Sequence, residues 1–231
     1  MSLYLIALAT FLVATSQQFG LSSTVSAQKK TPYEDDPKNF EHQHATELLC
    51  SGYTYYMWNH TYTPQPPSEC VSVKVTSGLR NGTYQVLLSH RFTGSKKMYS
   101  LNVTVHPLTS GSHTEDNALF FTFPSMEPDV VAEARTATEN VGSPGSAGIR
   151  LQDEKSGPQP PLYKFLYINS NKTCAALRVT YEQDGTGCEL FSVIERGAPL
   201  PVPQECMNVY IQNCPNTTSE VWKDGCKEGD Q

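Results

Sequence analysis

The stretch Asn171-Lys-Thr-Cys-Ala-Ala-Leu-Arg-Val-Thr-Tyr181, followed by Gly187-Cys-Glu-Leu-Phe191, contains two predicted strands joined by a tight turn. The strands cover 173–181 and 188–194, and Asp184-Gly185 between them is typical of a hairpin. If the chain is exported, its even set of cysteines around these strands indicates a disulfide framework whose pairing the sequence alone leaves open. The six cysteines are Cys70, Cys174, Cys188, Cys206, Cys214 and Cys226.

Six more segments have the composition of strands, with many aromatic and β-branched residues and alternating polarity. They cover 53–62, 70–75, 84–92, 98–105, 118–123 and 162–168. Eight strands in up-and-down order favour a closed antiparallel barrel, because closure leaves no exposed strand edge. A β-sandwich is the alternative. A barrel of this size can hold one small ligand, although its aromatic residues can also simply fill a closed core.

A short helix is predicted in the amino-terminal arm, 28–48. Its Glu34-Asp-Asp-Pro37 string has acidic residues before a proline, which favours a helix start. Phe40, His44 and Leu48 would then share one helical face. This pattern indicates a helix that covers or plugs one end of the β region.

The main predicted domain covers 49–231 and ends in a cysteine-rich helix at 203–213 and a tail. A segment rich in Gly, Ser and Pro interrupts it at 124–161. Such a composition buries too little apolar surface to offset the entropy of ordering, so we expect a mobile insertion there.

Residues 1–27 are typical of a secretory signal peptide. The apolar run from Leu3 to Ala14 is shorter than the ~20 residues that a bilayer span requires, and Val25-Ser-Ala27 has small side chains for cleavage. We therefore expect a secreted, monomeric product without a membrane partner. Export makes Asn-x-Ser/Thr sequons available for glycosylation. Such sequons begin at Asn59, Asn81, Asn102, Asn171 and Asn216.

Charge and motifs argue against several functional classes. The formal net charge of −6 is unlike that of nucleic-acid-binding proteins, which present a basic face to phosphates. His42 and His44 could suggest a metal site, but two ligands on a mobile arm make a poor one. The chain has no string typical of a nucleophile elbow, a zinc hydrolase or a phosphate-binding loop. We therefore expect neither an enzyme nor a bound cofactor or metal.

The chain resembles the salivary lipocalins of ticks, whose best-known members are the histamine-binding proteins. The resemblance covers most of the chain after the signal peptide. It rests on Tyr55-Tyr-Met57, Glu69-Cys-Val71, Cys174, Glu189-Leu190 and the cysteine-bearing carboxyl-terminal helix. It implies a lipocalin barrel that is secreted in saliva and binds a small molecule.

The resemblance also implies which cysteines pair. The implied disulfides are Cys70–Cys226, Cys174–Cys206 and Cys188–Cys214. Cys50 is left over, either as a buried free thiol or for an intermolecular bridge.

Two strings at the expected ligand site depart from the family pattern. Amine-binding members carry an acidic and then an aliphatic residue after the first cysteine, where this chain reads Cys174-Ala-Ala176. Phe191 stands where Trp or Tyr is usual in the second string. A buried protonated amine needs carboxylates or aromatic faces around it, and Ala175 supplies neither. The departure favours a neutral or amphipathic ligand over a small cation.

The two-residue period of a strand predicts the lining of the barrel. If Asn102 carries a glycan, Val103 faces inward, and by the same argument at Asn59 the side chains of Trp58, His60 and Tyr62 face inward. Glu189 is the carboxylate retained from the family pattern, although it could equally be a hydrogen-bonded structural residue. The residues expected to bind the ligand are Trp58, Tyr62, Val103, Ala175, Glu189 and Phe191.

Three functions fit these expectations. The first is capture of a hydrophobic or amphipathic, lipid-like host mediator inside the barrel. The second is binding of a biogenic amine, histamine or serotonin, by Glu189 within a cage of Trp58, Tyr62 and Phe191. The third is binding of a host protein by the insertion at 124–161, with the barrel as its scaffold.

Overall fold

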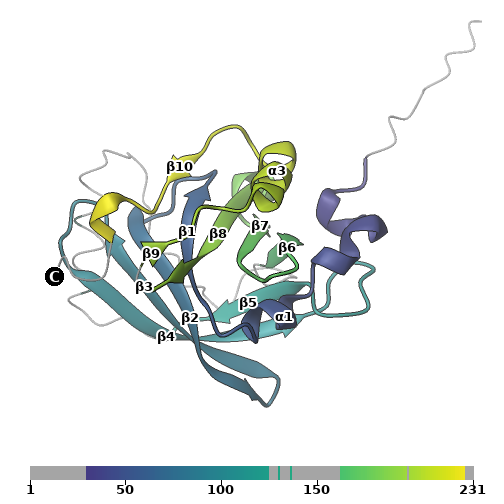
Figure 1. The fold of residues 1–231 in the computed structure, drawn as a ribbon, viewed down its shortest axis with the longest axis horizontal. Helices are drawn as coiled ribbons and strands as arrows, with labels where there is room; N and C mark the ends of the chain where they lie inside the picture. Colours follow the sequence, from purple (N-terminus) through teal and green to yellow (C-terminus); the bar gives the residue numbers. More distant parts are fainter. Residues whose placement is uncertain (1–29, 125–129, 131–135, 137–161, 197, 227–231) are drawn as a thin grey trace, which may run out of the picture. The chain divides into compact units, whose positions relative to one another are not determined.

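Eight consecutive antiparallel strands close into a barrel because the first of them pairs with the eighth (Figure 1). In this computed structural model they are β1 (Thr54–His60), β2 (Ser68–Arg80), β3 (Thr83–Phe92), β4 (Met98–Leu108), β5 (Ala118–Thr122), β6 (Tyr163–Ile168), β7 (Cys174–Val179) and β8 (Gly187–Glu195). Two short strands extend the sheet, β9 (Ala198–Pro199) against β8 and β10 (Ser219–Glu220) against β1. The closed barrel predicted from the strand pattern is confirmed, and the sandwich alternative is wrong.

The structure describes residues 30–124, 130, 136, 162–196 and 198–226. The chain separates into two units, Met1–Lys30 and Thr31–Gln231, and all the elements named here belong to the second. The predicted signal peptide and almost all of the predicted insertion lie outside the described residues.

Two of the hairpin turns fall where the sequence has residues that tolerate a left-handed backbone. Asn81 and Gly82, between β2 and β3, have φ angles of 50° and 82°. Asp184 and Gly185, between β7 and β8, have φ angles of 55° and 85°. Most other side chains would be strained there. The local chemistry of these turns helps to fix which strands become neighbours.

The predicted amino-terminal helix is present, but it is divided into two pieces. Asp36 caps a 3₁₀ helix, η2 (Pro37–His42), by accepting a hydrogen bond from the Lys38 backbone N–H at 3.2 Å. The α-helix itself, α1, covers only Ala45–Leu49. The single helical face expected for this arm is therefore split between two short helices.

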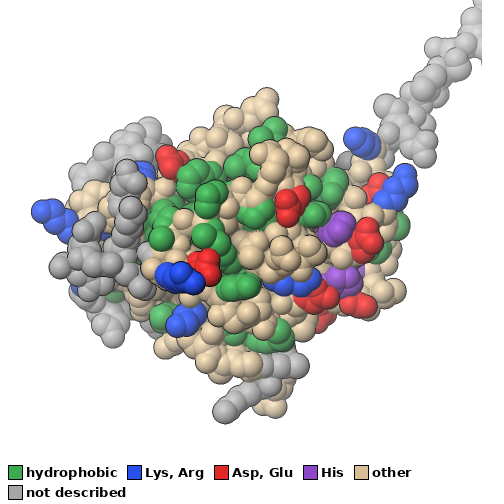
Figure 2. All heavy atoms as spheres, viewed as in Figure 1, with side chains coloured by type: hydrophobic (Ala, Val, Ile, Leu, Met, Phe, Trp, Pro, Cys, Tyr) green, Lys and Arg blue, Asp and Glu red, His purple; other side chains and the backbone are tan. Residues whose placement is uncertain are grey.

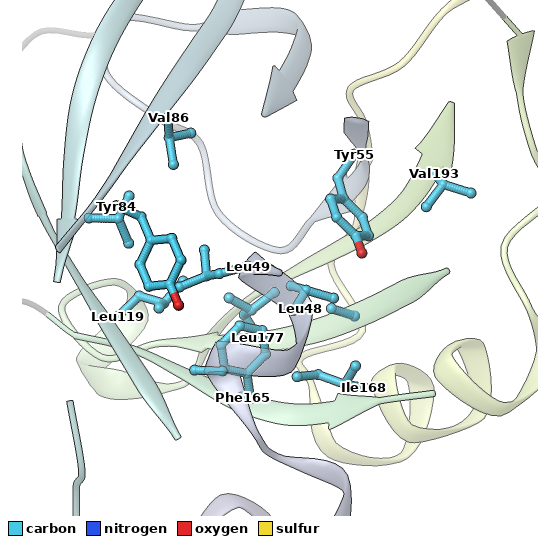
Figure 3. Close-up of a cluster of buried hydrophobic side chains, with 13 residues drawn as sticks. Leu48, Leu49, Tyr55, Tyr84, Val86, Leu119, Phe165, Ile168, Leu177 and Val193 are labelled. Carbon is cyan, nitrogen blue, oxygen red and sulfur yellow. The ribbon is translucent and has the colours of Figure 1, made fainter. Parts of the chain in front are cut away.

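Helix α1 plugs one end of the barrel. Ala45, Leu48 and Leu49 pack against side chains that the strands direct into the barrel, as Figure 3 shows for the two leucines. An ion pair between Glu47 of α1 and Lys172, in the turn between β6 and β7, lies beside this plug. The apolar face of the helix thus replaces solvent at this end.

The carboxyl-terminal helix, α3 (Gln204–Asn213), lies outside the barrel on β6, β7 and β8 (Figure 1). Its Cys206 and Tyr210 are buried with Leu166 of β6 and Leu190 of β8. This contact explains why every residue of β7 is buried, since one face of the strand meets the interior and the other meets α3. Among the described residues, no helix is long and apolar enough to cross a membrane.

Three disulfides fasten the carboxyl-terminal part of the chain to the barrel. They are the pairs that the family resemblance implies, Cys70–Cys226, Cys174–Cys206 and Cys188–Cys214. Two of them hold α3 to β7 and β8, and the third holds the tail to β2. Each contributes about 2 to 4 kcal/mol, mainly by restricting the unfolded chain.

Cys50 directly follows α1 and is the free cysteine of the described residues. It is exposed, so the buried thiol expected as one alternative is wrong. Its Sγ lies 3.4 Å from the hydroxyl oxygen of Tyr84.

A buried ion pair fastens the amino-terminal arm to the outer face of the barrel. Glu34 lies in the 3₁₀ helix η1 (Tyr33–Asp35), and one of its carboxylate oxygens is 2.9 Å from Nε of Arg178 in β7. A second contact of 2.9 Å joins Asp35 to Lys164 of β6. Loss of one partner of the buried pair would leave an uncompensated charge, so this contact fixes the position of the arm.

The plug gives a test of the fold. Leu49→Ala should lower the free energy of unfolding by about 2 to 5 kcal/mol, because Leu49 is 7% exposed and its truncation leaves a cavity. Urea titration followed by circular dichroism measures this loss. Ile211→Ala is the matched control, since Ile211 of α3 is 62% exposed and should lose less than about 0.5 kcal/mol. Equal losses in the two variants would contradict the placement of α1.

Candidate functional site

Each of the eight barrel strands contributes inward-pointing side chains to one apolar cluster (Figure 3). Because side chains alternate along a strand, the strand residues next to these cluster members face α3, the tail or solvent. The members contributed by the strands are Tyr55, Val73, Val75, Tyr84, Val86, Val105, Leu119, Phe121, Tyr163, Phe165, Ile168, Ala175, Leu177, Phe191 and Val193.

The interior is filled beneath α1 and becomes more accessible toward the opposite end. Tyr55, Phe165 and Val193, near α1, are buried. At the opposite end, which we call the mouth, β1, β5 and β7 finish and β6 and β8 begin. There Tyr163 is half-buried and Tyr181 keeps 42% of its surface accessible. The aromatic side chains of the wall are therefore more accessible at the mouth than beneath α1.

A buried carboxyl lies at the mouth. Glu189 of β8 is 4% exposed and accepts a hydrogen bond from the hydroxyl of Tyr62. Burial raises the pKa of Glu189 to about 7 in spite of that hydrogen bond, and the nearby Glu182 adds to the rise. Among the described residues no Lys or Arg forms an ion pair with Glu189. Near neutral pH the group therefore exists in comparable amounts of its protonated and ionised forms.

Two more tyrosines stand beside this carboxyl. The hydroxyls of Tyr163 and Tyr181 share a hydrogen bond, and their ring centroids are 5.5 Å apart. The ring of Phe121 lies 4.9 Å from that of Tyr163. Burial, and then the charge of Glu189, raise the pKa values of Tyr62, Tyr163 and Tyr181 above the ordinary value. All three hydroxyls stay protonated and can donate hydrogen bonds.

Sequence reasoning missed Phe121, Tyr163 and Tyr181 as members of this cluster. The alternation within each strand contains a signal for two of them, because Phe121 follows Leu119 and Tyr163 precedes Phe165 by two residues. No sequence pattern indicates that the strand ends carrying Tyr163 and Tyr181 bring their hydroxyls into contact. That contact depends on the β6–β7 register.

Five of the six residues expected to bind the ligand lie in the barrel interior. Tyr62 and Glu189 are in direct contact at the mouth. Ala175 and Phe191 are opposite each other on β7 and β8, deeper in the wall. Val103 of β4 is fully buried opposite the interior residue Val86 of β3. Contact of these residues with a ligand stays a prediction.

The expectation that Trp58 faces the interior is wrong. Trp58 continues the alternation that directs Tyr55 inward and Tyr56 outward, and the register between β1 and β8 then shifts between Met57 and Asn59. This β-bulge leaves Trp58 and Asn59 both facing outward, so an outward Asn59 does not imply an inward Trp58. Trp58 packs instead with the outer clusters, and its ring centroid lies 6.2 Å from that of Tyr56.

His60, beyond the bulge, returns to the interior. It stands opposite Glu189 in the β1–β8 ladder, and its ring centroid is 5.2 Å from that of Tyr62. Burial lowers the pKa of His60. The imidazole is therefore neutral at neutral pH and adds no cation to the mouth.

The histidines of the amino-terminal arm have structural contacts. Nδ1 of His44 lies 2.7 Å from a carboxylate oxygen of Glu115, and the His42 ring lies 4.8 Å from that of Tyr167. Figure 2 shows histidine and acidic side chains gathered over the amino-terminal elements. Within the described ranges, no three His, Cys, Asp or Glu side chains are grouped to hold a metal ion.

A family comparison matches almost the whole described chain. The sequence model of the family described as tick histamine binding protein matches residues 33–141 and 128–228. No curated protein sequence matches the chain significantly.

Several solved structures are similar to this one at low sequence identity. Apocrustacyanin C2 is 9% identical over 85% of this chain and 90% of its own, with a TM-score of 0.49. The allergen Per a 4 from cockroaches is 10% identical over 80% and 92%, with a TM-score of 0.47. The protein AM182, solved as a serotonin complex, is 15% identical over 84% and 90%, with a TM-score of 0.41.

The raised pKa of Glu189 predicts a specific pH dependence of stability. The folded state holds this proton more tightly than the unfolded state, whose carboxyl has its ordinary value of 4.5, so stability falls as pH rises from about 4.5 to about 7. Glu189→Gln should remove this fall and should be more stable than the unchanged chain at pH 8, by up to roughly 3 kcal/mol.

Chemical denaturation between pH 4 and pH 8 measures the effect. Glu195→Gln, at the exposed end of the same strand, is the matched control and should leave the pH dependence unchanged. If Glu189→Gln were less stable than the unchanged chain at pH 8, the carboxyl would not be desolvated as described.

Proposed function

Because the chain belongs to the tick histamine-binding protein family, we propose that it is a secreted salivary lipocalin that captures a small host mediator inside its barrel. The ligand is lipid-like, with an apolar body along the wall and one oxygen-bearing head group at the mouth. The observation that carries this proposal is that, among the described residues, Glu189 is the one buried acid in an otherwise apolar and aromatic interior.

The wall favours an apolar ligand on energetic grounds. Each buried CH₂ group contributes ~0.8 kcal/mol, so eight of them contribute roughly 6 kcal/mol before the cost of association. A single contact between an ammonium group and a carboxylate in this interior gains much less, because both ions lose their hydration. The apolar wall therefore contributes more to the free energy of binding than a contact with the one carboxyl.

The mouth offers suitable partners for an oxygen-bearing head group. One hydroxyl of the Tyr163–Tyr181 pair keeps a hydrogen to donate, whereas the Tyr62 hydroxyl already donates to Glu189. Glu189 accepts when ionised and donates when protonated. A carboxylate on the ligand can share one proton with Glu189, as paired carboxyls do. A ligand hydroxyl can form a hydrogen bond with either form of Glu189.

Binding of a biogenic amine is the second candidate. It is favoured by the rings of Tyr62 and Tyr163 beside Glu189, since an ammonium group is attracted both to a carboxylate and to aromatic faces. This cage differs from the predicted one, because Tyr163 and Tyr181 take the place of Trp58.

Two further expectations stay predictions. Secretion is supported by the three disulfides, which persist in oxidising compartments. Binding of a host protein through the insertion at 124–161 concerns residues that lie almost wholly outside the described ranges.

The sign of the pH dependence of affinity separates the candidates. Isothermal titration with a fatty acid, a sterol, histamine and serotonin across pH 5.5 to 8.5 measures it. A carboxylate-bearing lipid should bind more weakly as pH rises through about 7, because Glu189 then loses the shared proton. A neutral lipid should show little change. An amine should bind more tightly over the same range, because it needs the ionised form.

Variants at the mouth complete this experiment. Glu189→Gln should leave lipid affinity within about threefold and remove its pH dependence, since Gln still offers a hydrogen-bond donor and acceptor. The exposed Glu195 and the outer-face Tyr167 supply matched controls as Glu195→Gln and Tyr167→Phe. Affinity for an amine that rises with pH and falls more than about a hundredfold in Glu189→Gln would replace the lipid proposal with the amine.

A further inference from the structure

One disulfide sulfur lies against a buried cation. The guanidinium of Arg178 donates a hydrogen bond from Nη1 to Sγ of Cys188, with an N–S distance of 3.1 Å. Cys188 is 0% exposed and Arg178 is 7% exposed. A cation held this close to sulfur favours the thiolate form of the cysteine whenever the disulfide opens.

The other contacts of the guanidinium hold it in place. Nη1 also donates to the carbonyl of Thr186 at 2.7 Å, and Nη2 donates to the carbonyl of Asn213 at 2.9 Å. Nε donates to the carboxylate of Glu34 at 2.9 Å. A donor that is already fixed needs no rearrangement when negative charge develops on a neighbouring atom.

The two cysteines of this disulfide differ in their accessibility. Cys214 is the residue at which α3 ends, and it is half-buried. Cys188 lies within β8, beneath the helix. An attacking thiolate must reach one sulfur and expel the other, so the approach is to Cys214 and the leaving group is Cys188. The expelled sulfur is the one that Arg178 contacts.

We propose that Cys214 is a thiol-exchange site, at which a small thiol such as glutathione forms a mixed disulfide while Cys188 leaves as a thiolate. The sulfur of the incoming thiolate bonds to Sγ of Cys214, and the bond between Cys188 and Cys214 breaks. The electron pair of that bond goes to Cys188, beside the guanidinium. A second thiolate then attacks the added sulfur, which yields the disulfide of the small thiol and leaves both cysteines reduced.

The other two disulfides serve as comparisons within the same molecule. Both sulfurs of Cys174–Cys206 belong to fully buried residues, so an external thiol cannot approach either of them. In the third pair, Cys226 accepts a hydrogen bond from the backbone N–H of Lys223 at 3.2 Å, which is a neutral donor. Exchange at Cys188–Cys214 should therefore precede exchange at either of the others.

Glu34 opposes the effect of Arg178 on the sulfur. Its carboxylate binds the Nε edge of the same guanidinium and offsets part of the positive charge. Removal of this negative charge should strengthen the stabilisation of the Cys188 thiolate. Variants at Arg178 and Glu34 should therefore change the exchange rate in opposite directions.

The test uses the full oxidised chain after its exposed free thiol, Cys50, has been blocked. The chain is incubated with glutathione and quenched with acid at intervals, and free thiols are alkylated. Peptide mapping by mass spectrometry then locates the glutathione. The expected first product carries glutathione on Cys214 and a free thiol on Cys188. Glutathione on Cys188, or earlier opening of Cys174–Cys206, would overturn the proposal.

Two variants test the role of the guanidinium. Arg178→Gln should slow the formation of the mixed disulfide by about three- to tenfold, because the leaving thiolate loses a charge-assisted hydrogen bond. Glu34→Gln should speed it by a smaller factor. A general loosening of the fold would speed exchange in both variants. A rate for folded Arg178→Gln equal to or above that of the unchanged chain overturns the proposal. If Arg178→Gln does not fold, an unchanged or slower rate in Glu34→Gln overturns it.

Discussion

The pairing of β1 with β8 is the constraint on which the rest of the structure depends. It joins the first and last barrel strands, which lie far apart in the sequence, so the chain must close a long loop before an interior exists. Once the ladder forms, strand alternation divides the residues into an inner set and an outer set. The inner set forms the wall and the mouth, and the outer set forms the surface on which α3 packs.

Strand β8 shows this division at neighbouring positions. Cys188 faces outward and is bonded to Cys214, whereas Glu189 faces inward and meets Tyr62. The outer side of the strand is dense with fixed contacts, including those of Arg178. These contacts on the outer face fix the backbone at Glu189. A buried carboxyl keeps one hydrogen-bond geometry only when its backbone is held in this way.

Local chemistry made most of the fold predictable from the sequence. The helix expected at 203–213 is α3 (Gln204–Asn213), and the strand expected at 84–92 is β3 (Thr83–Phe92). These segments follow from composition, alternation and turn residues. The strand expected at 70–75 was too short, because β2 continues to Arg80 through polar residues that do not resemble a half-buried strand.

The site was less predictable because it depends on spatial register. A one-residue bulge between Met57 and Asn59 leaves no mark in the sequence pattern, yet it places Trp58 and Asn59 on the same outer face. The inward direction of Tyr62 and Glu189 could be anticipated, since it follows from the two-residue alternation of strand side chains. The contact between Tyr163 and Tyr181 arises from two strand ends that only the assembled sheet brings together. The disulfide pairing came from family resemblance rather than from spacing.

If the barrel binds its ligand as proposed, the packing beneath α1 also limits the length of that ligand. The side chains packed beneath α1, among them Tyr55 and Phe165, form a floor at one end, and Glu189 marks the level of the mouth at the other. A molecule whose head group stays beside Glu189 must fit its tail into the depth between them. Binding would then select for ligand length. A tail that is too long would push its head group away from Glu189, and one that is too short would leave the lower part of the interior unfilled.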